Sequence, residues 1–520
     1  MNLAQIEPSS AMAIQKIVIV GGGTAGWMTA SLLERFLRSS GCQITVLDSP
    51  TKESIGVGEA TVPSMVRFLR NLDFEENEWM QRCHATYKLG IRFDDFSEVG
   101  KSYWHPFGLC GGIIDGLDLF HFWVKGVQEG QLRGDTYAAY SLQRFCADLG
   151  KGPRPIHGSS SIVDSGGYAF HLDALLLADY LREKATQRGV RFRLAEVERV
   201  ELGSDGAIQH LQLSNGQIEA ADLYIDCSGF SGQLISAGMH VGMEDWSDYL
   251  LCDRAVTIHL PVQSKRLPFT KATGLSAGWM WQIPLSQRTG CGYVYSSQHL
   301  SDDDAVQELM EVLQLDVLPS EARFLNMTIG RRTESWVKNC VAVGLASGFV
   351  EPMESTGIFM IQYAVEKLME CFPDKRFHSA LIRTFNDQVN STLDHVRDFI
   401  QLHYLVSQRS EPFWQASRAV TVSSSLHQLL EVYDEIGEIH LSHVPLFPDV
   451  SHFHILSGSN RLPRRTNPLV AMSDFPAVLD ILSQIRHQNR EEVFSLPTMD
   501  QLMDSVHQPQ AEGFSIVESF

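Results

Sequence analysis

The sequence Lys16-Ile-Val-Ile-Val-Gly-Gly-Gly-Thr-Ala-Gly26 predicts a buried parallel strand that passes through a glycine-rich turn into a helix. In such a turn Gly21 permits the tight bend, Gly23 lets backbone amides approach a pyrophosphate, and Gly26 lets the helix pack closely on the strand. Asp48 lies 22 residues beyond Gly26, after a second predicted strand at 42–47, where a carboxylate would bind a ribose hydroxyl. The chain therefore opens with a predicted dinucleotide-binding βαβ unit.

Further apolar runs extend this unit along the chain. Residues 221–227 and 340–345 predict two more buried strands, and the alternation over 190–220 with its Ser214-Asn215-Gly216 turn predicts a β-meander. From residue 358 the apolar spacing becomes helical, over 358–371, 377–407, 424–436 and 477–485, whereas 450–468 is rich in Ser, Asn and Pro and predicts a loop. Asp302-Asp303-Asp304 predicts the first turn of a helix after Ser301, and Thr498 with Gln501 predicts a capping box.

Composition limits the class of protein. The 520 residues carry a formal net charge of −20, which argues against a nucleic-acid partner. Nine scattered cysteines without a Cys-x-x-Cys pair indicate a reducing compartment and no disulfide framework, and His440, His443, His452 and His454 lack metal-ligand spacing. We find no signal peptide and no apolar run that would span a membrane. We expect a soluble, cytoplasmic protein without a metal site, and leave a homodimer open.

The nucleotide cofactor is expected to be FAD. The sequence has no second Gly-x-Gly-x-x-Gly for a nicotinamide cofactor. Asp222-Leu-Tyr-Ile-Asp-Cys-Ser-Gly229 resembles the second characteristic segment of FAD monooxygenase-type folds. Without a nicotinamide site, reduced flavin has to come from a separate flavin reductase, which is the expected protein partner.

Several separated motifs point to one family. Trp279-Met-Trp-Gln-Ile-Pro284 places two indoles on one face of a predicted strand. Gly56-Val-Gly-Glu-Ala-Thr-Val-Pro-Ser64, Ala85-Thr-Tyr-Lys-Leu-Gly90 and Glu351-Pro-Met-Glu-Ser-Thr-Gly-Ile358 are the further matches. Together with the glycine fingerprint, these five segments resemble, in order, those of the flavin-dependent tryptophan halogenases. The resemblance implies an α/β fold with a Rossmann-like FAD-binding body and its β-meander (14–75 and 166–358), and a mostly helical substrate lobe (76–165 and 359–520).

The resemblance also implies a role for each motif residue. Lys88 and Glu354 are the expected catalytic residues, and the backbone amides of Thr356 and Gly357 are the expected halide site. His105 and Phe107, in Trp104-His-Pro-Phe-Gly108, are expected to contact substrate together with Ser355. The expected barrier between flavin and substrate is formed by Trp279, Trp281, Ile283 and Pro284. The expected FAD-binding residues are Gly21, Gly23, Thr24, Ala25, Gly26, Asp48, Glu59, Ala60, Val197, Leu345 and Ile358.

The implied reaction uses reduced FAD and dioxygen to convert chloride or bromide to hypohalous acid, which then halogenates a separate small aromatic substrate. Tryptophan-specific members hold the amino-acid group with a tyrosine pair and a following glutamate, but 445–458 contains no Tyr-Tyr pair. A zwitterion without such partners would be bound poorly, so we expect an indole or another electron-rich ring. The alternatives are a flavin-dependent aromatic hydroxylase, a halogenase of a carrier-tethered ring, and an inactive flavin-binding protein.

Overall fold

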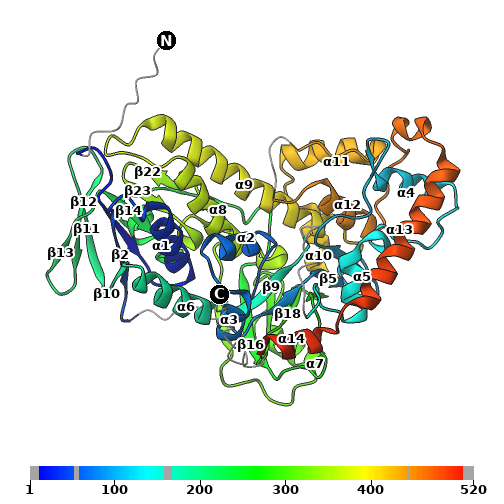
Figure 1. The fold of residues 1–520 in the computed structure, drawn as a ribbon, viewed down its shortest axis with the longest axis horizontal. Helices are drawn as coiled ribbons and strands as arrows, with labels where there is room; N and C mark the ends of the chain where they lie inside the picture. Colours follow the sequence, from blue (N-terminus) through cyan, green and yellow to red (C-terminus); the bar gives the residue numbers. More distant parts are fainter. Residues whose placement is uncertain (1–10, 52–57, 157–166, 442–445, 508–520) are drawn as a thin grey trace, which may run out of the picture.

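The computed structural model describes residues 11–51, 58–156, 167–441 and 446–507. Two parts lie side by side, an α/β body and a mainly helical part, and the long helix α9 (Ser379–Leu405) runs from one to the other (Figure 1). No helix in the described ranges combines the length and the apolar character that a membrane span requires. The α/β fold expected from the sequence is confirmed.

The nucleotide-binding part is a six-stranded sheet in the order β10-β2-β1-β14-β23-β22. Pairing is parallel from β10 to β23, and only β22 runs antiparallel. Helices α1, α6 and α8 pack beside it. The bounds are β1 Lys16–Val20, β2 Gln43–Asp48, β10 Arg191–Leu194, β14 Leu223–Asp226, β22 Trp336–Val337, β23 Cys340–Ala342, α1 Thr24–Leu37, α6 Ala174–Gln187 and α8 Gly357–Glu370.

The expected meander is the antiparallel sheet β11 (Val197–Leu202), β12 (Ile208–Leu213) and β13 (Ile218–Glu219). Strand β10 also falls within 190–220, but it pairs in parallel with β2 and so extends the main sheet. Two smaller groups are β15 (Met243–Asp245) with β21 (Gly330–Arg332) and β24 (Gly348–Phe349), and the pair β7 (Ile113–Ile114) with β8 (Leu117–Asp118).

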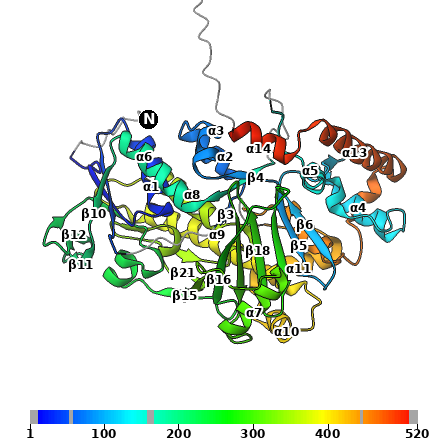
Figure 2. The same cartoon turned by 90° about the horizontal axis from the view of Figure 1, so that it is seen from below.

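A seven-stranded sheet in the order β20-β16-β19-β18-β17-β5-β6 supports the barrier motif (Figure 2). Its first five strands come from 254–326, but β5 and β6 come from the segment that starts at residue 76. The expected boundary at residue 76 therefore does not coincide with a sheet boundary. The strands are β5 Gly90–Asp94, β6 Ser102–Pro106, β16 Arg254–Leu260, β17 Thr270–Leu275, β18 Gly278–Pro284, β19 Thr289–Tyr295 and β20 Arg323–Asn326.

A small sheet brings together segments that are far apart in the chain. Strand β9 (Ala169–Asp173) pairs antiparallel with β3 (Gly58–Ala60) on one side and with β4 (Thr86–Lys88) on the other. Because β3 lies within the expected flavin strap and β4 ends at Lys88, this sheet places the nucleotide-binding part next to the expected catalytic lysine.

The remaining helices are α2 Ser64–Asn71, α3 Glu76–Arg82, α4 Leu119–Gln128, α5 Leu142–Leu149, α7 Asp302–Leu313, α10 Pro412–Ala419, α11 Ser424–Ile436, α12 Asp449–Gly458, α13 Phe475–Ser495 and α14 Met499–His507. The capping box is confirmed, since Thr498 N donates to Gln501 Oε1 (2.9 Å) and Gln501 N to Thr498 Oγ1 (3.2 Å). Ser301 caps α7 as expected. The loop predicted at 450–468 is wrong for its first half, which is α12. This helix is buried over Ser451–Leu456, so it shows no amphipathic period that would reveal it.

Candidate active site

The glycine-rich turn has the geometry that its sequence predicts. Gly21 has φ +113°, and a side-chain carbon there would lie 2.2 Å from the Cys227 carbonyl oxygen. A carbon added to Gly26 would lie 1.8 Å from the carbonyl oxygen of Gly21. Both positions therefore require glycine for close packing of strand, turn and helix.

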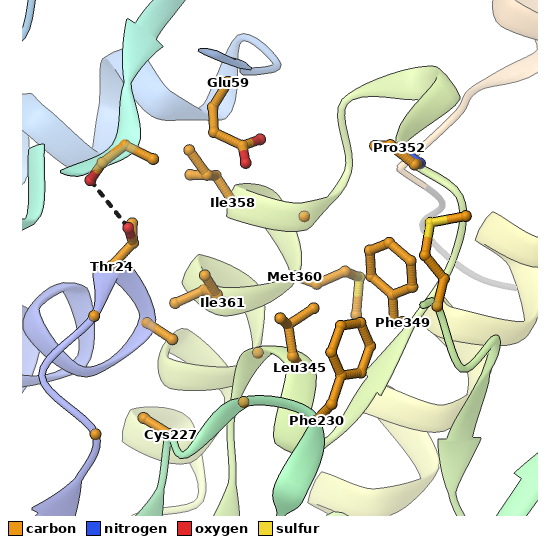
Figure 3. Close-up of a pocket in the computed structure, with 18 of the residues that line it drawn as sticks. Thr24, Glu59, Cys227, Phe230, Leu345, Phe349, Pro352, Ile358, Met360 and Ile361 are labelled. Carbon is orange, nitrogen blue, oxygen red and sulfur yellow. Dashed lines mark hydrogen bonds between the residues drawn. The ribbon is translucent and has the colours of Figure 1, made fainter. Parts of the chain in front are cut away.

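A cavity of about 490 Å³ opens from this turn. Ten of the eleven residues expected to hold the cofactor line it, and Gly26 packs behind them. The lining set is Gly21, Gly23, Thr24, Ala25, Asp48, Glu59, Ala60, Val197, Leu345 and Ile358. In Figure 3 Thr24, Glu59, Leu345 and Ile358 surround one space, beside the paired rings of Phe230 and Phe349.

The cavity fits FAD at both its polar and its apolar parts. Helix α1 begins after Gly23, whose position makes no side-chain capping hydrogen bond, so the first-turn amides are available to a pyrophosphate. Asp48 Oδ1 accepts from the Gly22 amide (2.9 Å), which fixes this carboxylate at the turn. Burial raises the pKa of Glu59 to about 7, with a further contribution from Asp173. A weakly charged carboxyl is suited to a place next to a flat, apolar ring.

The barrier motif forms one wall of this cavity. Trp279, Trp281 and Ile283 alternate along β18 and line the cavity, with ring centroids of the two indoles 6.0 Å apart. Gly292 on β19 lies opposite Trp281, and a carbon added there would lie 2.2 Å from that indole. The indole therefore lies flat across the neighbouring strand. Pro284 ends β18, and its carbonyl accepts from Thr86 Oγ1 (2.6 Å).

Glu351 fixes the position of the Trp279 indole. The Trp279 indole N–H donates to Glu351 Oε2 (3.0 Å), and the Tyr404 hydroxyl donates to the same oxygen (2.5 Å). Glu351 is fully buried, and burial raises its pKa to about 7 although both hydrogen bonds oppose the shift. The residue therefore links the barrier strand to the segment that carries Glu354.

Lys88 lies at the far side of the cavity wall and has no solvent exposure. Its ammonium donates to Ser355 Oγ (2.7 Å) and to the Thr61 carbonyl (3.1 Å), and lies 5.0 Å from the centre of the Phe107 ring. Burial lowers the pKa of Lys88 to about 7, although the Glu354 carboxylate opposes the shift. Because Ser355 lines the cavity, Lys88 is one hydrogen bond away from the expected flavin site.

Glu354 is held between two histidines. His105 Nδ1 lies 2.8 Å from Glu354 Oε2, and His403 Nε2 lies 2.9 Å from Glu354 Oε1. Burial raises the pKa of Glu354, but the two imidazoles outweigh burial and bring the pKa to about 2. Tyr103 is hydrogen-bonded to the other nitrogen of His403 (2.9 Å), which orients that ring. Glu354 is therefore a fixed carboxylate.

Ser355, which lines the cavity and accepts a hydrogen bond from Lys88, has an unusual backbone conformation. It has φ +61° and ψ +36°, in the left-handed region, and ends the 3₁₀ turn Pro352–Glu354. The next helix, α8, begins at Gly357 without a side-chain cap from Thr356, and both residues line the cavity. A carbon added to Gly357 would meet nothing within 4 Å. Backbone N–H groups at an uncapped helix start that face open space are typical of an anion site.

The structure thus brings the expected residues together as two groups. The residues expected to bind cofactor and halide or to form the barrier line the cavity, except Gly26 and Pro284, and so does Ser355, which was expected to contact substrate. The other expected residues, Lys88, Glu354, His105 and Phe107, lie outside the lining and are buried. Gly56 and Val57 of the expected strap lie outside the described residues.

Three groups that contact the expected site residues were not predicted from the sequence. His403 lies on the buried face of α9, where a histidine within a helical apolar pattern was the available signal. The Thr61 carbonyl is a backbone group and gives no signal in the residue type. Gly292 belongs to Thr289-Gly-Cys-Gly-Tyr293, where glycines alternate on a strand and indicate a close approach of another group.

The tryptophan halogenase family model matches residues 16–474 of this chain. The chain belongs to the tryptophan halogenase family. Among curated members, tryptophan 6-halogenase SttH of Streptomyces toxytricini is 35% identical over 510 residues, covering 93% of this chain and 96% of that protein. Tryptophan 7-halogenase RebH of Lentzea aerocolonigenes is 33% identical, with 95% and 99% covered.

A solved structure resembles this family member over nearly its full length. BrvH, a flavin-dependent halogenase from Brevundimonas sp. BAL3, superposes with a TM-score of 0.89 at 38% identity, covering 95% of this chain and 99% of that one. The family resemblance and the fold class predicted from the sequence are therefore both confirmed.

Proposed function

We propose that this protein is a two-component halogenase that uses reduced FAD, dioxygen and chloride or bromide to halogenate an electron-rich ring of the indole type. One observation carries the proposal. A fully buried lysine contacts the wall of the cofactor cavity on one side and lies near a buried carboxylate, outside that cavity, on the other. Lysine is rarely buried without function, because its desolvation is costly.

The cavity side prepares the oxidant. Bound reduced FAD supplies the oxygen activation that converts halide to hypohalous acid. The backbone amides of Thr356 and Gly357 hold the halide at the start of α8 without a charged side chain. Trp279 and Trp281 exclude the arene from this cavity, because the indoles fill the wall and have less than a tenth of their surface exposed.

The buried residues Lys88 and Glu354, outside the cofactor cavity, carry out the substitution. Arene and hypohalous acid give halogenated arene and water: the carbon–halogen bond forms, the halogen–oxygen bond breaks, the departing hydroxide takes a proton from the Lys88 ammonium to become water, and the ring proton passes to Glu354. The low pKa of Glu354 does not prevent this step, because the cationic ring intermediate that carries the new halogen is a far stronger acid than a carboxylic acid. Near neutral pH Lys88 is present as ammonium and as amine. The ammonium polarises hypohalous acid by hydrogen bonding, and the amine accepts the halogen as a haloamine; both routes require Nζ at this position.

The supply of reduced FAD is proposed to come from a separate flavin reductase, because the sequence carries one glycine fingerprint. The barrier also argues against the alternative of an aromatic hydroxylase, which needs its substrate at the flavin. Trp279 is held there by Glu351, so the wall is a fixed structure.

The proposed substrate is a neutral indole-type ring in preference to free tryptophan. SttH and RebH are named for tryptophan, but the described segment 446–458 presents no tyrosine pair. Calorimetry is expected to show weak binding of tryptophan, and submicromolar affinity would contradict this part of the proposal. The alternative substrate is a ring tethered to a carrier protein. The panel of free arenes described next distinguishes the two, because an enzyme that requires a carrier would halogenate none of them.

The test is mass spectrometry of a panel of free arenes, including indole and tryptophan, incubated with the protein, FAD, a flavin reductase, NADH, oxygen and bromide. We expect the paired bromine isotope pattern on an indole-type ring. Absence of bromination across the panel, with FAD bound and reduced, would overturn the proposal.

A further inference from the structure

His454 is a buried histidine without a hydrogen-bond partner among the described residues. It lies on α12 with 2% of its surface exposed, and neither Nδ1 nor Nε2 has a partner. A buried polar atom without a partner is unfavourable, and buried polar atoms in native proteins usually pair with protein groups, bound water or a ligand.

The position of His454 identifies where that group would lie. Its ring centre is 6.4 Å from that of His105, which is hydrogen-bonded to Glu354, and 4.9 Å from that of Tyr137. The stacked rings of Phe399 and Phe447, with centres 4.0 Å apart, also lie near His105, at 5.6 Å and 6.1 Å between ring centres. His454 thus belongs to the aromatic surroundings of Glu354 and not to the cofactor cavity.

The chemistry of His454 limits the ligand. Burial lowers its pKa well below the usual range, with His105 and Arg144 adding to the shift, so the ring is neutral at neutral pH. A neutral imidazole offers one donor and one acceptor. It is suited to an uncharged heteroatom such as a ring N–H or a hydroxyl, and poorly suited to a carboxylate that needs a cation.

We propose that His454 is a specificity-determining residue that accepts a hydrogen bond from an N–H or O–H group of a neutral aromatic substrate beside Glu354. This inference rests on the proposed function for the location of the substrate. It adds which atom of the ring is recognised and which residue recognises it.

The experiment pairs a change in the substrate with a change in the protein. Indole and 1-methylindole differ in the single donor, and His454→Leu removes the acceptor. In the unmodified protein, 1-methylindole is expected to lose on the order of tenfold to a hundredfold in kcat/KM relative to indole. In His454→Leu that ratio is expected to fall to about one, because no acceptor is left to lose.

His452→Leu is the matched control, since it removes a histidine two positions earlier on α12 whose Nδ1 is already paired with the Pro448 carbonyl (3.2 Å). The methylation penalty is expected to persist in this control. An equal penalty in the unmodified protein and in His454→Leu, or no penalty in either, would overturn the inference.

Ligand-observed NMR of the same pairs separates this inference from the proposed function. If no arene is halogenated but indole binds better than 1-methylindole only when His454 is present, the inference holds and the proposed reaction fails. If halogenation occurs and neither binding nor turnover depends on the His454–donor pair, the inference fails and the reaction stands.

Discussion

Replacing Lys88 by methionine is expected to stabilise the protein at neutral pH while abolishing halogenation. The pKa of this lysine is about 7 in the fold against an ordinary 10.5. Between about pH 7 and pH 10.5, Lys88 therefore binds a proton more strongly in the unfolded chain than in the folded chain. Because the folded pKa is depressed, protonation of Lys88 disfavours the folded state. This penalty is absent above about pH 10.5 and grows as the pH falls to 7, so the protein loses stability over that range.

The magnitude follows from these two pKa values. Desolvation of Lys88 disfavours the folded state by about 4 kcal/mol at pH 7 and by about 1 kcal/mol at pH 10. Methionine removes this term, but it also removes hydrogen bonds to Thr61 and Ser355 worth together about 2 kcal/mol. The variant is therefore expected to be more stable by about 2 kcal/mol at pH 7 and slightly less stable at pH 10.

The assay is unfolding of the FAD-free protein by heat or denaturant at matched pH values. Lys101→Met is the control, because Lys101 is an exposed lysine and its removal should produce no such pH dependence. Halogenation by Lys88→Met is expected to fall by about a thousandfold or more with FAD affinity unchanged. A stability difference that does not change between pH 7 and 10, or near-normal turnover, would refute the reasoning.

Three further outcomes are expected. Glu354→Gln should lower kcat by at least about a hundredfold without a matching change in FAD affinity, measured by steady-state turnover and flavin titration, because an amide is a far weaker proton acceptor than a carboxylate; unchanged turnover would remove Glu354 from the mechanism. Glu351→Gln should match the unmodified protein in stability near pH 4.5 and exceed it by up to about 3 kcal/mol at pH 8, because the raised pKa of Glu351 means that its contribution is lost as the pH rises through 7; parallel stability curves would show that this carboxyl is not desolvated. Gly26→Ala should abolish FAD binding in a flavin fluorescence titration, since its side chain would overlap the Gly21 carbonyl, and retained micromolar affinity would contradict the account of the turn.

Motifs with a strong local physical requirement were predictable from the sequence. Gly21 and Gly26 show their constraint directly, because no other residue fits the turn. Lys88 and Glu354 could be predicted only from their positions within the ordered family motifs, since a lone lysine is usually a surface charge. The family match confirms the resemblance, whereas the roles of these two residues stay predictions.

Features that depend on tertiary packing were not predictable. Helix α12 is buried over its central residues, so its sequence lacks the period that exposes an ordinary surface helix. The placement of β5 and β6 beside β17 depends on long-range pairing that no local pattern reports. The same limit applies to His454, whose importance follows from its ring neighbours and from the absence of a hydrogen-bond partner for either ring nitrogen among the described residues.

Isotope labelling of the products tests most directly whether the arene is kept away from the flavin. The protein is incubated with FAD, a flavin reductase, NADH, ¹⁸O₂ and indole, once with bromide and once without halide, and the products are analysed by mass spectrometry. With bromide the ring is expected to carry bromine, and without halide it is expected to carry no ¹⁸O. An ¹⁸O-hydroxylated ring in the halide-free reaction would show that the substrate passes Trp279 and Trp281, and would contradict the proposed exclusion of the substrate from the cofactor cavity.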